Sequence, residues 1–102
     1  MNERQKYEID FSKPPSSNWS NISKISYLQR RVIVYSLMYY EHNESCVSDF
    51  RYDAIVHQLV RMQNESSEKE LKKTTYYYAF YDFDGSTGYY LASRLKKKIK
   101  NI

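Results

Sequence analysis

The stretch "SDFRYD", residues 48–53, places two carboxylates and a phenol where one ligand could touch all three. On a helix that begins at Ser48, Asp49 lies in the first turn, with Tyr52 three residues later and Asp53 four, so the three side chains share one surface. Two acids beside an aromatic face suit a flat cationic ring such as an oxidised nicotinamide, because the acids offset its charge and the π-face attracts it. The alternative is ordinary helix chemistry, in which first-turn acids interact with the helix dipole and Tyr52 packs against a neighbouring helix.

Two helices should position these side chains. Ser20 or Asn21 can cap a first helix, after which apolar residues recur at three-to-four spacing. Ser48 can cap a second helix that also carries an apolar stripe. Because the polar stretch between them, residues 41–46, is short, the sequence predicts an antiparallel helical hairpin over residues 20–64.

Strands are expected on either side of the hairpin. Residues 5–12 alternate between apolar and polar side chains, as a half-buried strand requires. Residues 74–83, "TTYYYAFYDF", have the β-branched and aromatic content of a strand that should pair with the first. A glycine-containing turn and a basic helix over 89–99 complete a strand–turn–basic helix unit over residues 74–102. The sequence therefore predicts a single α+β domain over 1–102, helix-dominated, with a central antiparallel helical hairpin, a small two-stranded sheet and a C-terminal basic helix.

Residues 32–63, "VIVYSLMYYEHNESCVSDFRYDAIVHQLVRMQ", resemble the amino-terminal NAD-binding (Ia) domain of NAD-dependent DNA ligases. That domain is a helical hairpin with a tyrosine-rich first helix and a second helix that opens with "SDAEYD". Asp49, Tyr52 and Asp53 match this motif residue for residue. The resemblance, which covers about a third of the chain, implies that these residues contact the nicotinamide mononucleotide (NMN) half of NAD.

The resemblance also implies that a tyrosine of the first helix stacks on the nicotinamide ring, and Tyr35 is the best match. Ser36 stands where the family usually has a histidine, and the loop between the helices is longer by a few residues, so Tyr39 is the alternative stacking residue. The whole chain resembles small phage-encoded proteins that carry a ligase Ia-like domain without a ligase. The implied ligand is NMN or NAD, and the implied ligand-binding residues are Tyr35, Ser36, Tyr39, Asp49, Tyr52 and Asp53.

The sequence offers no complete set of catalytic or metal-binding residues. Nucleotidyl transfer by a ligase needs the lysine of a K-x-D-G motif, and the nearest stretch, "DFDG", has Asp82 in that position. The stretch "DFDGST" also resembles the nucleophile loop of haloacid-dehalogenase-type phosphatases, with Asp82 as nucleophile and Asp84 as general acid. The residues after Asp84 cannot supply that family's later motifs, and an acidic turn is the simpler interpretation. The lone Cys46 lacks the further ligands of a zinc site. We expect a non-enzymatic protein without a metal.

A second hypothesis is that the chain acts by contact with another protein. The 12 tyrosines suit an interface, because tyrosine combines a large apolar area with a polar tip. Such a protein could be a phage counter-defence or host-takeover inhibitor directed at a CRISPR effector or an NAD-consuming immune enzyme. The alternative is that these tyrosines pack within the domain. The expected protein-interface residues are Tyr77, Tyr81, Asp82 and Asp84.

A third hypothesis is weak binding of nucleic acid through the C-terminal helix. The net charge of +4 is concentrated there, although a basic helix can also be a solvated face. The basic residues concerned are Arg94, Lys96, Lys97, Lys98 and Lys100. The chain has no apolar run long enough for a secretion signal or a membrane span, so we expect it in the cytoplasm of the host cell, without a membrane partner.

Overall fold

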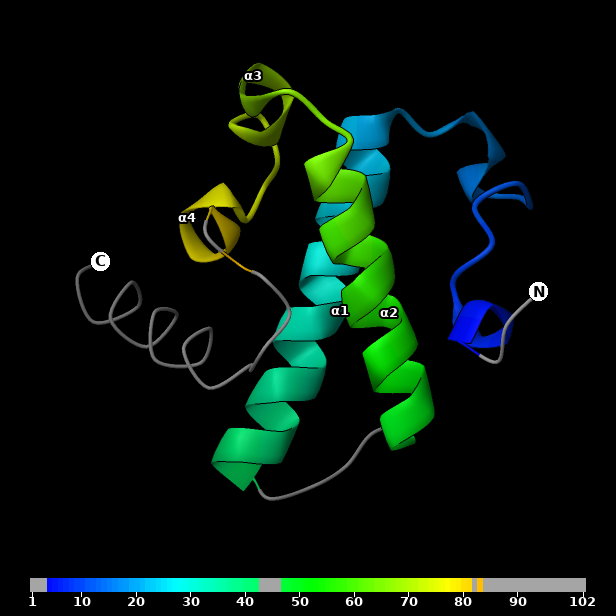
Figure 1. Ribbon diagram of the computed structural model, residues 1–102, viewed down its shortest axis with the longest axis vertical. Coiled ribbons are helices and arrows are strands. Elements are labelled where there is room, and N and C mark those ends of the chain that lie inside the picture. Colours follow the sequence, from blue (N-terminus) through cyan, green and yellow to red (C-terminus); the bar gives the residue numbers. More distant parts are fainter. Residues whose placement is uncertain (1–3, 43–46, 82, 84–102) are drawn as a thin grey trace.

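Two long helices form the centre of the fold in the computed structural model of the protein (Figure 1). The structure describes residues 4–42, 47–81 and 83. Helices α1 and α2 run side by side, so the predicted hairpin and the predicted dominance of helices are confirmed. The elements in chain order are the 3-10 helices η1 (Arg4–Tyr7) and η2 (Ser16–Asn18), then α1 (Asn21–His42), α2 (Asp49–Asn64), α3 (Glu68–Leu71) and α4 (Tyr77–Phe80).

Both long helices begin at the serines that the sequence indicates. The Oγ atom of Ser20 accepts a hydrogen bond from the Ser23 backbone N–H at 3.2 Å. The Oγ atom of Ser48 accepts one from the Arg51 backbone N–H, also at 3.2 Å. Each serine thus provides a partner for a backbone donor that has none within the first turn of a helix. These local contacts fix where α1 and α2 start, and hence where Asp49 lies.

The core lies between the two helices and is closed by the segments that flank them. Ile25, Leu28 and Val32 of α1, with Ile55 and Leu59 of α2, are completely buried. The recurrence of these residues every three or four positions gives each helix one apolar face, and removal of these faces from water stabilises the pair. The N-terminal segment packs on the α2 side, whereas α3 and α4 lie on the opposite side, next to α1 (Figure 1).

The predicted strand over residues 5–12 is wrong. The chain forms η1 and then an irregular segment whose backbone bonds to a side chain of α2 instead of to a second strand. The Ile9 N–H donates to Gln58 Oε1 at 2.9 Å, and Gln58 Nε2 donates to the Ile9 carbonyl at 2.8 Å. The alternation of apolar and polar residues did indicate which side chains face the core, since Ile9 and Phe11 pack against it. The Gln58 side chain thus pairs the two backbone groups of Ile9, which a neighbouring strand would otherwise have bonded.

The predicted strand over residues 74–83 is also wrong for the described residues, and the two-stranded sheet with it. The segment contains the short helix α4, which places Ala79 and Phe80 in the core. Two of its backbone donors bond to side chains of α1: the Thr75 N–H to Ser26 Oγ at 3.1 Å, and the Tyr76 N–H to Gln29 Oε1 at 3.3 Å. Strand propensity describes how side chains fit a pleated surface, and without a partner strand the packing on α1 decides the conformation.

The glycine-containing turn and the C-terminal basic helix over 89–99 lie outside the described residues. Within the part of the chain that the structure describes, no helix is both long and apolar enough to cross a bilayer.

Candidate functional site

The structure brings Tyr35 and Tyr52 together across the hairpin. Their ring centroids lie 6.4 Å apart with an interplanar angle of 63°, which is an edge-to-face contact. Tyr35 is only 8% exposed, and Tyr52 is partly buried. These two rings therefore form a packed floor near the loop end of the hairpin, and Tyr35 offers little free ring surface to a ligand.

Ser36 supports this floor and does not face solvent. It is 1% exposed, and its Oγ lies 3.2 Å from the Tyr52 hydroxyl, so the two groups share a hydrogen bond. This bond fixes the orientation of the Tyr52 ring. The resemblance implies a ligand contact at Ser36, and the structure places this buried side chain against the Tyr52 hydroxyl.

Tyr39 is the exposed aromatic residue of the site. It continues the buried stripe of α1, because Leu28, Val32, Tyr35 and Tyr39 follow one another at spacings of four, three and four residues and so lie on one face of the helix. It is nevertheless 56% exposed, because the stripe here reaches the last turn of α1. Tyr39, the alternative stacking residue, is thus more accessible to a ligand ring than Tyr35.

The two acids lie at the same end of the hairpin as Tyr39. On α1, Tyr39 lies four residues closer to the loop than Tyr35, which corresponds to about 6 Å of helix rise. On α2, Asp49 lies three residues closer to the loop than Tyr52, which corresponds to about 4.5 Å. Asp49 and Asp53 are both exposed. Asp53 Oδ1 lies 3.3 Å from His57 Nε2, and both side chains are about half exposed. We call these residues, Tyr35, Tyr39, Asp49, Tyr52 and Asp53, the hairpin-end site.

The hairpin-end site combines an exposed ring, a packed aromatic floor and an acidic rim. An exposed tyrosine ring can stack on a flat ligand, and carboxylates within one or two turns favour a ligand that carries positive charge. Among residues 4–42, 47–81 and 83 no group of acids, histidines and cysteines is arranged to hold a metal ion. An exposed ring beside two exposed carboxylates has the chemical character that a flat cationic ligand requires.

The predicted protein-interface residues are only partly described. Tyr81 is 60% exposed, and its ring lies 6.2 Å from that of Tyr77. The Tyr77 hydroxyl donates a hydrogen bond to the Glu68 carboxylate, which raises the pKa of Tyr77. Asp82 and Asp84 lie outside the described residues, as do all five basic residues of the predicted C-terminal helix, Arg94, Lys96, Lys97, Lys98 and Lys100.

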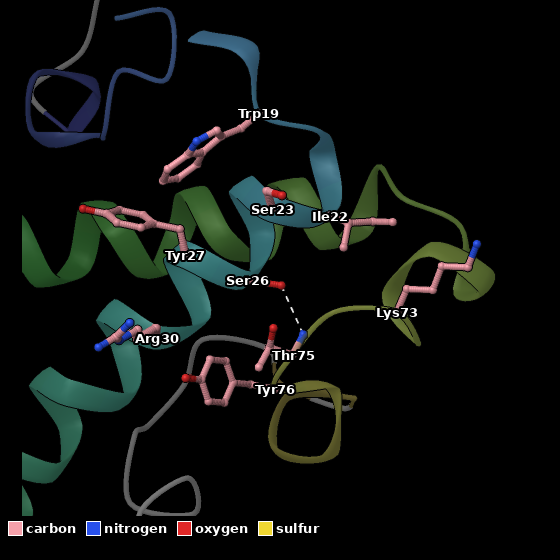
Figure 2. Close-up of a pocket in the computed structure, with 9 residues that line it drawn as sticks. All are labelled: Trp19, Ile22, Ser23, Ser26, Tyr27, Arg30, Lys73, Thr75 and Tyr76. Atoms are coloured by element: carbon pink, nitrogen blue, oxygen red, sulfur yellow. Dashed lines mark hydrogen bonds between the residues drawn. The ribbon is translucent and has the colours of Figure 1, made fainter. Parts of the chain in front are cut away.

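Sequence reasoning missed a groove along the first half of α1 (Figure 2). This α1 groove encloses about 470 Å³, and Figure 2 shows its floor on α1, with Trp19 on one side and Thr75 and Tyr76 on the other. Its lining residues come from two segments about fifty positions apart in the sequence, so no local motif marks it. They are Trp19, Ile22, Ser23, Ser26, Tyr27, Arg30, Lys73, Thr75 and Tyr76.

Comparison of the chain with family models, with curated proteins and with solved structures finds no match in any of the three.

Proposed function

We propose that this chain is a non-enzymatic binding protein whose hairpin-end site recognises a nicotinamide nucleotide, NMN or NAD, through its oxidised ring. Such a ring is flat, aromatic and positively charged. It would stack on Tyr39, above the floor formed by Tyr35 and Tyr52, with Asp49 and Asp53 near its charge.

The single observation that carries the proposal is the exposure of Tyr39. A tyrosine at 56% exposure, in line with the buried stripe of a helix, presents a rigid aromatic face at a point where packing could have covered it. The Tyr35–Tyr52 contact and the hydrogen bond between the hydroxyl groups of Ser36 and Tyr52 hold the neighbouring surface in one arrangement. A preorganised surface loses less entropy when a ligand binds.

The acids supply the preference for a cation. Asp49 lies in the first turn of α2 and is exposed, beside the positive end of the helix dipole. Asp53 lies one turn further along the same helix. Their charges favour the oxidised nicotinamide ring over the reduced ring, which is uncharged.

Isothermal calorimetry with NMN and with reduced NMN tests the proposal. Tyr39→Leu should weaken NMN binding by about 2- to 30-fold, the range of an exposed to a desolvated cation–π contact. Tyr81→Leu is the matched control, since Tyr81 is 60% exposed but belongs to another part of the molecule. Asp49→Asn should lower the preference for the oxidised form, with Asp10→Asn as the control for loss of an exposed carboxylate.

Two results would reject the nucleotide site. One is the absence of heat with NMN at millimolar concentration. The other is equal affinity for the oxidised and reduced forms, because a site built on charge cannot treat them alike.

A second candidate function is contact with another protein, as expected of a phage counter-defence inhibitor. The observation that favours it is the exposure of Tyr81, and the neighbouring Tyr78 is also exposed. Large exposed aromatic residues close in sequence are typical of binding surfaces. Purification of tagged protein from host cells, with Tyr81→Ala compared with Tyr39→Ala, distinguishes the two functions: a partner protein lost only with Tyr81→Ala would support this function. Binding of nucleic acid by the C-terminal helix stays a prediction.

A further inference from the structure

We propose that the α1 groove binds a short stretch of single-stranded nucleic acid, with bases against its aromatic residues and phosphates at its two cationic ends. The proposal is independent of the hairpin-end site and of the basic residues near the C-terminus. It rests on the charge, the aromatic content and the dimensions of the groove.

The charge of the groove is positive. Arg30 and Lys73 line it, and none of its nine lining residues is acidic. Arg31 adds to the positive charge beside it: Arg31 Nε and one of its terminal nitrogens donate to the Tyr27 hydroxyl at 2.9 and 2.6 Å, a bond that raises the pKa of the guanidinium. A groove of this character attracts an anion.

The two cations that line the groove lie at opposite ends of it. Figure 2 shows Lys73 beyond Ile22 at one end, and Arg30 at the other. Ile22 and Arg30 are eight residues apart on α1, which corresponds to about 12 Å of helix rise. One phosphate group cannot contact both ends, whereas successive phosphates of one strand can. The spacing therefore favours an oligonucleotide over a free phosphate or a mononucleotide.

Aromatic side chains stand between these ends. Trp19, Tyr27 and Tyr76 are each partly exposed and line the groove on both sides. Trp19 is braced by contacts with Tyr27 at 5.4 Å and with Phe11 at 6.2 Å between ring centroids, so its indole is held rigidly. Proteins that bind single-stranded nucleic acid combine aromatic side chains with basic ones, because every base has a π-face that can stack on an aromatic ring.

Hydroxyl groups on the floor complete the set of contacts. Ser26 Oγ accepts the Thr75 N–H at 3.1 Å, and Ser23 Oγ lies 3.2 Å from Ser20 Oγ. A hydroxyl that accepts one hydrogen bond can still donate its own proton to a phosphate or sugar oxygen. An acidic peptide could pair with the two cations, but it has fewer flat groups to stack on the three aromatic rings. Nucleic acid, which offers both phosphates and bases, is therefore the better fit.

Trp19 is the single tryptophan of the chain, and this makes the test specific to the groove. Octamers of deoxythymidine and of uridine should quench the Trp19 emission as they bind, and the two octamers distinguish DNA from RNA as the preferred strand. Anisotropy of an end-labelled octamer, followed in parallel, reports binding anywhere on the protein. The quenching of Trp19 and the anisotropy of the octamer should give the same dissociation constant.

Paired charge variants locate the contact. The double variant Arg30→Gln/Lys73→Gln should bind the octamers at least tenfold more weakly at low salt. The fall of the logarithm of the binding constant with the logarithm of the salt concentration should also become less steep by about 1.4, since each phosphate contact on a single strand contributes about 0.7. The control double variant, Arg51→Gln/Lys6→Gln, removes the same charge from exposed residues outside the groove and should bind as the wild type does.

Four results would overturn the proposal. They are no binding at low salt, a rise in anisotropy without quenching of Trp19, equal weakening by both double variants, and quenching by a tyrosine-containing polyglutamate peptide with the affinity of the octamers. The third would show that only the net charge matters, and the fourth that the groove suits acidic chains in general.

Discussion

Replacement of Gln58 by leucine tests whether one side chain holds the N-terminal segment on the hairpin. Gln58 is buried on α2, and its amide both accepts from and donates to the backbone of Ile9, at 2.9 and 2.8 Å. Leucine has a similar volume, so packing against the core is largely kept. Both hydrogen bonds are lost, and the two backbone groups of Ile9, which is partly buried, lose their partner.

The expected cost follows from these two bonds. Each contributes a net stabilisation of about 0.5–1.5 kcal/mol, and leaving the partners unpaired in a partly buried position adds to the loss, so we expect a total of about 2–3 kcal/mol. For a domain of this size each kcal/mol corresponds to roughly 4–8 °C in the midpoint of thermal unfolding. The midpoint of Gln58→Leu should therefore fall by roughly 10–20 °C.

Thermal and urea unfolding, followed by circular dichroism, measure the global loss, and hydrogen exchange of the Ile9 amide measures the local one. The neighbouring, exposed His57→Leu controls for the apolar area that leucine adds to α2. If Gln58→Leu unfolds at the wild-type temperature and the Ile9 amide stays protected, the two hydrogen bonds do not hold the segment and the reasoning is wrong.

Three further predictions concern smaller changes. Ser36→Ala should cost about 1 kcal/mol in urea unfolding, because Tyr52 loses a buried partner, and should weaken NMN binding in calorimetry if the floor must be fixed. The hydrogen bonds from the Ser12 hydroxyl and backbone N–H lower the pKa of Asp10. The stabilisation from Asp10 is therefore present above the ordinary pKa of aspartate and is lost as the pH falls through the lowered pKa. Titration of Asp10 by nuclear magnetic resonance should give a midpoint below 3.8. Ser26→Ala removes a bond that holds one side of the α1 groove and should weaken octamer binding by Trp19 quenching while NMN binding is unchanged.

The hairpin could be predicted because its determinants are local. Ser20 and Ser48 each bond to a backbone N–H three residues later, and the apolar stripes repeat within each helix. The first turn of α2 follows directly from Ser48, so the exposed position of Asp49 could be read from the sequence as well.

The two predicted strands failed because a strand depends on its partner. Residues 5–12 and 74–83 have the composition of strands, yet Gln58 bonds the Ile9 N–H in the first segment, and Ser26 and Gln29 bond the N–H groups of residues 75 and 76 in the second. A glutamine or serine on the inner face of a helix gives no sign in the sequence that it will bond a distant backbone. The two central helices were predicted correctly, whereas both flanking strands were wrong.

Burial is what the sequence could not assign within the candidate site. Tyr35 and Tyr39 lie one turn apart on the same helix and have the same chemistry, but one is 8% exposed and the other 56%. The difference arises because Tyr35 lies opposite Tyr52, whereas Tyr39 lies at the end of the hairpin. The α1 groove could not be predicted either, since its two sides are built from segments distant in sequence.

The two candidate sites depend on different contacts made by the hairpin, and this makes them separable. The side of the α1 groove that contains Thr75 and Tyr76 depends on Ser26 and Gln29, in the first half of α1. The hairpin-end site depends on the contact between Tyr35 and Tyr52 in the second half. A change confined to one set leaves the other intact, because sites that share no partners contribute independently. If a change in the groove altered NMN binding, the two halves of the hairpin would be coupled and one ligand site would have to span both.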